Sequence, residues 1–267
     1  ANGVSIGDRV VINPSMTKVR GNSHFLGLDD IYGVLGVIGA SLDGGYAELC
    51  AAPASHVHVI PAGISFEEAA CIPTCYATAW QALVEIGELK AGETVLINGA
   101  GGGVSSAGIQ LGKKLGATVL ATARTARKLE HAARIGADHV LINQGTGIAR
   151  WARELTAGRG VDMVFDHVGP ALWQSSLDAL RPRGRLITCG ATTGPEVTIG
   201  LGQLHRMGIR IMGSDCYTYE QFQRVLAFYW QGGFRKMIDS EFPLAEAGEA
   251  HRRMDSGDVT GKILLKP

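Results

Sequence analysis

The chain has 267 residues, a hydrophobic fraction of 46% and a mean hydropathy of +0.11, which together predict a soluble globular protein of one large or two modest domains. Basic and acidic residues number 25 each, so charge offers no argument for a nucleic-acid partner or an anionic membrane. No apolar run is long enough to span a membrane and the first residues lack a signal-peptide pattern, so we expect a cytoplasmic protein.

Two residue types carry further information. The 37 glycines are about twice the usual share and predict tight turns and backbone that approaches a ligand closely. The five cysteines are odd in number and form no CxxC pair, which is typical of buried free thiols in a reducing compartment.

Residues 1–75 have the pattern of short strands joined by turns. Strands are predicted over 8–13, 46–51 and 57–60, with Tyr46 interpreted as a side chain packed in the core. A helix is predicted to begin after Ser65, whose hydroxyl can accept from backbone N–H groups while Glu68 reaches back to cap it.

From residue 93 onward, short apolar strands alternate with helices. Strands so apolar need cover on both faces, and their alternation with helices predicts a doubly wound parallel sheet of the Rossmann type, an α/β fold. The predicted strands span 94–98, 118–123, 139–142, 162–166, 185–189 and 209–212, and the helices span 104–115, 126–135, 148–155 and 170–180. Helices over 219–231 and 245–254 and a last strand over 262–265 follow.

The clearest motif is the glycine-rich turn that contains Gly99, Gly101, Gly102 and Gly103 and continues into Val104. It follows a predicted strand and opens a predicted helix, the context that marks a dinucleotide-binding turn. Free N–H groups and the partial positive charge at a helix N-terminus hold a pyrophosphate, and a Cβ atom at the closest approach would push the phosphates away. We therefore predict that this turn binds the pyrophosphate of a nicotinamide cofactor.

The end of the next strand indicates which nicotinamide cofactor is bound. NAD sites usually place Asp or Glu there to accept from the ribose 2′-hydroxyl. This chain instead has Arg124, Thr125 and Lys128, and the first acid is Glu130. Because basic side chains attract a 2′-phosphate and a carboxylate would repel it, we predict NADP(H) in preference to NAD(H). The alternative interpretation is that Arg127 and Lys128 belong to a solvated first helical turn.

These motifs, in this order, resemble the medium-chain dehydrogenase/reductase superfamily, which includes zinc alcohol dehydrogenases and zinc-free quinone oxidoreductases. The resemblance rests on Gly7-Asp-Arg-Val, Gly44-Gly-Tyr-Ala-Glu, Gly102-Gly-Val, Asp166-His-Val-Gly and Gly261-Lys-Ile-Leu-Leu, and it covers nearly the whole chain. It implies a Rossmann domain over 76–213, and a partial GroES-like β-domain formed by 1–75 and 214–267. It also implies hydride transfer to or from a carbonyl, quinone or activated alkene, and a homo-oligomer, dimer or tetramer.

The sequence departs from the family pattern in three places. Family members normally have several strands before the position at which this chain begins, so we expect either a natural truncation or a fragment. By resemblance, a zinc-ligand position falls on Thr74, with Cys75 one residue out of register, and the stretch 17–30 lacks the cysteines of a structural zinc lobe. A solvated loop is favoured over a metal site at His24, Asp29 and Asp30, so zinc is not expected. Ser105 replaces the third glycine of the dinucleotide fingerprint.

The resemblance also places residues around the nicotinamide end of the cofactor. It implies that Thr78 packs beside the nicotinamide, and that backbone and hydroxyl groups of the segments after two strands hold the ribose and carboxamide. The implied residues of those segments are Val168, Gly169, Gly190, Ala191 and Thr192. His167 is a candidate acid–base residue, but we favour a strand-end residue that contributes only its backbone, so no catalytic residue is assigned.

Three functions remain open from the sequence. The leading one is a zinc-independent, NADP(H)-dependent reductase that acts on a small molecule. The second is a zinc alcohol dehydrogenase whose ligands lie in the segment that this chain lacks. The third is a non-catalytic NADP(H)-binding module.

Overall fold

The computed structural model describes residues 3–16, 36–143, 147–214 and 216–267. They form two compact units, one of Ala1–Ala77 with Cys216–Pro267 and the other of Thr78–Asp215. The divisions fall at residues 77 and 215, where the sequence predicted them at 75 and 213. No helix of the described residues combines the length and apolar character needed to cross a membrane.

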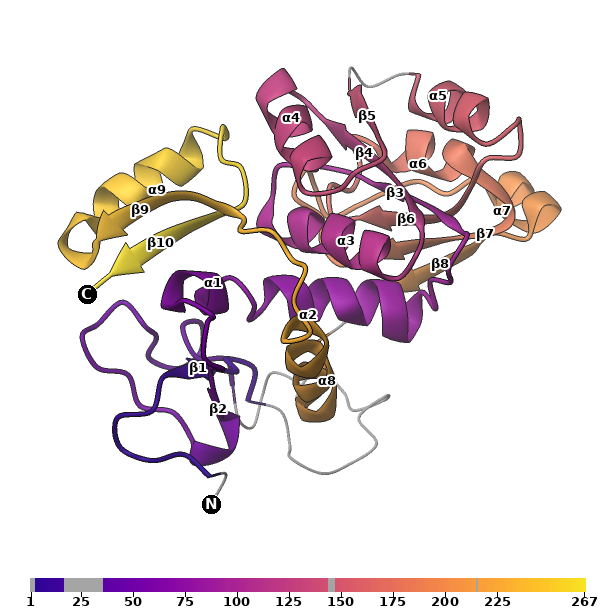
Figure 1. The fold of residues 1–267 in the computed structure, drawn as a ribbon. Helices are drawn as coiled ribbons and strands as arrows, with labels where there is room; N and C mark the ends of the chain where they lie inside the picture. Colours follow the sequence, from indigo (N-terminus) through magenta and orange to yellow (C-terminus); the bar gives the residue numbers. More distant parts are fainter. Residues whose placement is uncertain (1–2, 17–35, 144–146, 215) are drawn as a thin grey trace. The chain divides into compact units, whose positions relative to one another are not determined.

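The second unit, called the Rossmann unit below, is built on a parallel sheet of order β5-β4-β3-β6-β7-β8 (Figure 1). The strand order reverses between β3 and β6, and this is the switch point at which doubly wound sheets bind their ligands. The strands are β3 (Thr94–Ile97), β4 (Thr118–Ala123), β5 (His139–Ile142), β6 (Val161–Asp166), β7 (Leu180–Thr188) and β8 (Arg210–Gly213). The predicted α/β fold with a doubly wound parallel sheet is confirmed.

Helices connect these strands and cover the sheet. They are α3 (Gly103–Lys114), α4 (Ala126–Arg134), α5 (Ile148–Leu155), α6 (Trp173–Ala179) and α7 (Leu201–Met207). The short α7 and the early start of β7 were not predicted. A helix that begins as α2 (Cys75–Trp80) and continues as the π-helical η3 (Gln81–Ile86) precedes the sheet and was also not predicted.

Alternate residues of the sheet strands point to opposite faces, as the period of a strand requires. Leu96, Leu120 and Val164 are fully buried in a cluster with residues of α5 and α6. On α3, a Cβ atom at Gly108 would lie 3.1 Å from the Phe165 ring, so Phe165 meets the opposite helix layer. Cover on both faces explains why these strands are almost wholly apolar.

The first unit contains two small sheets and several helices. Strand β1 (Val10–Ile12) pairs antiparallel with β2 (Val57–Val59), and β9 (Ile238–Pro243) pairs parallel with β10 (Lys262–Lys266). Its helices are α1 (Phe66–Ala70), α8 (Tyr219–Tyr229) and α9 (Ala247–Asp255), with short 3-10 helices η2 (Ala54–His56) and η4 (Leu244–Glu246). The GroES-like character of this unit stays a prediction.

Two predictions in this unit need revision. Ser65 caps α1 by accepting from the Glu68 N–H at 3.2 Å, as predicted, but the Glu68 carboxylate accepts from the Tyr229 hydroxyl at 3.3 Å. The strand predicted over 46–51 is wrong, because this segment pairs with no strand of the described chain. Tyr46 is 63% exposed and its hydroxyl lies 3.2 Å from His251 Nε2, so its predicted core position is also wrong.

Candidate cofactor site

The glycine-rich turn lies at the carboxyl end of β3 and leads into α3. Gly99 has a φ of +67°, which favours glycine, and its carbonyl oxygen accepts from the Gly102 N–H at 3.1 Å. Gly102 is the N-cap of α3, and no acceptor among the described residues takes the N–H groups of Gly103 and Val104. The turn therefore presents unpaired N–H donors at a helix N-terminus, the arrangement that binds an anion.

The backbone at Gly102 shows that the space above the turn is open. Its φ of −78° suits any residue, and the nearest protein atom to a Cβ atom placed there is the Ser105 hydroxyl oxygen at 3.4 Å. Neither backbone conformation nor protein packing therefore demands glycine at this position. A pyrophosphate bound at the helix N-terminus would occupy the space that a Cβ atom would fill, and it would therefore require glycine here. The turn thus fits a dinucleotide.

Behind the turn, Ser105 connects two chain segments. Its hydroxyl donates to the Gly99 carbonyl at 2.7 Å and also lies 2.8 Å from Nε2 of His167, the residue that follows β6. Burial lowers the pKa of the His167 imidazole, although the charge of neighbouring Asp166 opposes the shift. The prediction that His167 contributes only its backbone is incomplete, because the imidazole contacts both Ser105 and Gly99.

A buried polar network holds the strand ends that carry the turn. The Asn98 amide donates to Asp166 Oδ1 at 3.0 Å and to the Ser176 hydroxyl at 2.8 Å, while its oxygen accepts from Thr122 at 3.0 Å. Asp166 also accepts from the Gly169 N–H at 2.9 Å. These bonds join the ends of β3, β4 and β6 to α6. Sequence reasoning missed this network, although a polar residue at or next to the carboxyl end of each apolar strand could have indicated it.

The basic cluster predicted to hold a 2′-phosphate lies at the start of α4. Arg124 and Thr125 are exposed, Lys128 is half-buried, and the first turn of α4 contains no acidic residue. Thr125 is the N-cap of α4 but its hydroxyl makes no capping hydrogen bond. The Lys128 stem passes so close to Gly101 that a Cβ atom there would lie 2.5 Å from it. The cluster and the glycine turn therefore adjoin.

The segments after β6 and β7 meet at the same edge of the sheet. The Thr192 N–H donates to the His167 carbonyl at 3.2 Å, and the Thr193 hydroxyl donates to the Val168 carbonyl at 2.6 Å. A Cβ atom at Gly169 would lie 3.3 Å from the Ala191 Cα.

The structure thus brings the loop residues predicted around the nicotinamide end together with the glycine turn, since Val168 lies against Gly99 and Ala191 against Gly169. The residues at the edge are Val168, Gly169, Gly190, Ala191 and Thr192, and the last three are exposed. Thr78 is half-buried in α2, outside the loops at the sheet edge.

The described residues provide no ligand set for a metal ion, since no three His, Cys, Asp or Glu side chains among them gather closely enough. The Cys71 thiol donates to the Glu67 carbonyl at 3.3 Å, and burial raises the pKa of Cys71 to about 12 and raises that of Cys75. None of the five cysteines forms a disulfide, but only Cys71 and Cys75 are buried, and Cys50 is exposed. His24, Asp29 and Asp30 lie outside the described residues.

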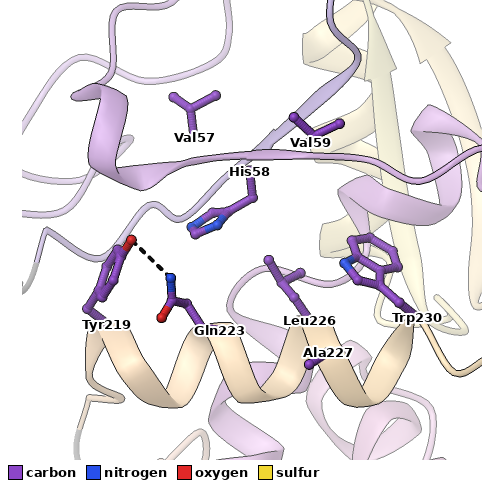
Figure 2. Close-up of a pocket in the computed structure, with 8 residues that line it drawn as sticks. All are labelled: Val57, His58, Val59, Tyr219, Gln223, Leu226, Ala227 and Trp230. Carbon is purple, nitrogen blue, oxygen red and sulfur yellow. Dashed lines mark hydrogen bonds between the residues drawn. The ribbon is translucent and has the colours of Figure 1, made fainter. Parts of the chain in front are cut away.

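The first unit contains a separate pocket of about 460 Å³ between β2 and α8. Figure 2 shows His58 on β2 pointing toward Tyr219 and Gln223, with Leu226 farther along α8 and Trp230 directly after the last residue of α8. The His58 Nε2 atom is buried and has no hydrogen-bond partner among the residues that the structure describes. Burial, followed by the charge of His56, lowers the pKa of His58. Two aromatic side chains, Tyr219 and Trp230, therefore line this pocket together with His58.

Comparisons with known proteins give the family. Residues 103–231 match the family model described as zinc-binding dehydrogenase. A quinone oxidoreductase of Pseudomonas aeruginosa is 33% identical over 233 residues, which cover 84% of this chain and 72% of that protein. The chain belongs to the medium-chain dehydrogenase/reductase superfamily. The predicted enzyme class, an NAD(P)-dependent oxidoreductase, is thereby confirmed.

Solved structures of superfamily members agree with the fold over most of the chain. An NAD-dependent alcohol dehydrogenase has a TM-score of 0.91 at 34% identity, and the match covers 99% of this chain and 77% of that one. A mycobacterial protein complexed with NADPH has a TM-score of 0.76 at 30% identity, covering 84% of this chain and 71% of that one.

Proposed function

We propose that this chain binds NADP(H) and transfers hydride between that cofactor and a carbonyl, quinone or activated alkene, without zinc. The observation that carries the cofactor choice is the basic cluster of Arg124, Thr125 and Lys128, placed beside the glycine turn with no acid in the first turn of α4.

The electrostatics of this cluster favour a 2′-phosphate. A site for NAD would use a carboxylate at the end of β4 to accept from the ribose hydroxyl, and that carboxylate would repel a phosphate. Arg124 stands there instead, and its guanidinium makes no hydrogen bond or ion pair with the described residues. A planar guanidinium can bind a phosphate through two parallel hydrogen bonds.

The remaining residues would position the cofactor. The N–H groups of Gly103 and Val104 would hold the pyrophosphate, and the loops after β6 and β7 would receive the nicotinamide and its ribose. When bound, the nicotinamide supplies or accepts the hydride. The protein is then required to orient the two reactants and exclude water from between them.

The similar proteins support both parts of the proposal. The mycobacterial relative is complexed with NADPH, and the Pseudomonas relative is named a quinone oxidoreductase. The similar alcohol dehydrogenase is described as NAD-dependent, so cofactor choice differs among these relatives. The basic cluster of this chain is the reason to favour NADP(H). Thr74 at the implied ligand position supports chemistry without zinc.

The cofactor choice is tested by measuring dissociation constants for NADPH and NADH. We expect NADPH to bind more tightly, and Arg124→Ala to weaken NADPH about tenfold while it changes NADH less than about twofold, since only NADPH has the 2′-phosphate. Arg150→Ala is the matched control, because Arg150 is an exposed arginine of the same unit, paired with Glu154 on α5. Equal losses for both cofactors in Arg124→Ala would remove the assignment.

The reaction is tested by following NADPH absorbance with a quinone, an enone and an aldehyde. Oxidation of NADPH by at least one of them, in protein that contains no stoichiometric zinc, is the expected result. Stoichiometric zinc would identify an alcohol dehydrogenase of the zinc type. Tight NADPH binding with no turnover of any substrate would identify a binding module and contradict the proposed reaction.

A further inference from the structure

The glycine turn departs from the usual dinucleotide fingerprint at Ser105, where the third glycine is expected. Ser105 does more than fit in place of that glycine. Its side chain is fully buried, and its two hydrogen bonds connect the first glycine of the turn to the residue that follows β6. The serine that replaces the third glycine is therefore paired with a second side chain, His167.

The two distances determine the direction of the hydrogen bonds. A serine hydroxyl has one proton, and a carbonyl oxygen has none. Since Ser105 lies 2.7 Å from the Gly99 carbonyl oxygen, its proton is donated there. The contact of 2.8 Å to His167 Nε2 then requires the imidazole to donate. His167 must therefore have its proton on Nε2.

The imidazole also packs directly on the turn. A Cβ atom at Gly99 would lie 2.9 Å from His167 Cε1, and a Cβ atom at Gly190 would lie 3.4 Å from His167 Cβ. The backbone carbonyl of His167 accepts from the Thr192 N–H. The side chain of His167 therefore contacts the glycine turn, while its backbone bonds to the loop after β7. The Gly99 carbonyl, in turn, accepts from both Ser105 and the Gly102 N–H.

We propose that His167 is a positioning residue of the cofactor turn, acting through the Ser105 hydroxyl to hold Gly99 and the first N–H groups of α3 where they meet the pyrophosphate. This inference rests on the proposed function, in which the turn binds NADP(H). His167 touches the turn and has no assigned contact with the reacting atoms.

The test compares four variants with the unaltered chain. Ser105→Ala removes the hydroxyl, His167→Met removes the donor at similar volume, and His167→Gln keeps an N–H donor at the position of Nε2. The fourth combines Ser105→Ala with His167→Met. Dissociation constants are measured for NADPH and for adenosine 2′-monophosphate, which has the 2′-phosphate but no pyrophosphate, and the unfolding temperature is recorded for each protein.

Ser105→Ala and His167→Met are each expected to weaken NADPH about tenfold, the usual cost of leaving one buried polar group without its partner. The double variant should lose no more than either single one, because both changes break one connection. His167→Gln should restore most of the affinity. Affinity for adenosine 2′-monophosphate should change less than about twofold, because that ligand does not reach the turn.

Three results would overturn the inference: equal losses for both ligands, additive losses in the double variant, or no rescue by His167→Gln. Equal losses accompanied by a lower unfolding temperature would show that the pair only stabilises the unit. If the unaltered chain bound neither NADPH nor NADH, the proposed function itself would fail, and this inference would fail with it. That outcome is distinguished from the other three by the unaltered chain alone.

Discussion

A Cβ atom at Gly102 would lie 3.4 Å from the nearest protein atom, whereas one at Gly160 would lie 2.6 Å from the Ala179 carbonyl oxygen. Gly160 also has a φ of +89°, a conformation that costs a side-chain-bearing residue free energy. The reason for a glycine therefore differs between these two positions. Gly160 is required by the backbone around it, whereas nothing in the described protein requires Gly102, and under the proposed function the bound cofactor does.

Alanine at these two positions should distinguish a glycine required for folding from a glycine required for binding. Gly102→Ala is expected to leave the free energy of unfolding within about 0.5 kcal/mol of the original while weakening NADPH at least tenfold. Gly160→Ala should lower the free energy of unfolding by about 2 kcal/mol or more. Urea unfolding and NADPH titration measure both quantities. Loss of stability in Gly102→Ala without loss of affinity would contradict this view of the turn.

At the scale of elements, one buried ion pair connects β7 to the segment that leads into β3. The Arg185 side chain is 5% exposed and its guanidinium bonds both carboxylate oxygens of Glu93, at 3.0 and 2.5 Å, and the carbonyls of Gly87 and Glu88. Burial opposes ionisation of Glu93, but the hydrogen bonds and charge of Arg185 outweigh it and lower the pKa of Glu93.

Breaking this pair from one side should be costly. Arg185→Met is expected to lower the free energy of unfolding by about 3 kcal/mol, because it leaves a partly buried carboxylate without its partner. Adding Glu93→Leu should recover most of that loss. Arg150→Met, which breaks an exposed pair with Glu154 on α5, should cost less than about 0.5 kcal/mol. Similar costs for Arg185→Met and Arg150→Met, measured by urea unfolding, would show that burial is unimportant here.

At the scale of the whole molecule, acid stability depends on the carboxylates whose pKa differs between the folded and the unfolded state. The Asp239 side chain, on β9, is 1% exposed and accepts from the Arg253 guanidinium at 3.0 Å and from the Thr260 N–H at 3.0 Å. Burial alone would raise its pKa, but these hydrogen bonds lower the pKa of Asp239 from 3.8 to about 2.

A pKa that is lower in the folded state gives stability that is present above the unfolded value and is lost as the pH falls. Asp239→Asn should therefore lower the free energy of unfolding by about 2 kcal/mol at neutral pH. The difference from the original chain should shrink as the pH falls from about 4 toward 2. Asp255→Asn, an exposed carboxylate on α9, is the control and should show little change. A difference that is constant with pH would contradict the assignment.

Local sequence patterns by themselves determined the six strands and four of the helices of the Rossmann unit, the glycine turn between β3 and α3, and the family. These features depend on periodicity and on residue types within one turn or one strand, so neighbouring residues are enough to predict them. The strand predicted around Tyr46 failed for the same reason, because a strand needs a partner that lies elsewhere in the chain.

Only the tertiary structure decided which distant side chains meet. Ser105 and His167 are separated by 62 positions, and Asn98 and Asp166 by 68, yet each pair is hydrogen-bonded at the carboxyl edge of the sheet. Parallel strands bring such ends together through crossovers whose lengths no local pattern fixes. The sequence could therefore predict which ligand the turn binds. The contacts that position the turn form only when β3 and β6 lie side by side in the folded sheet.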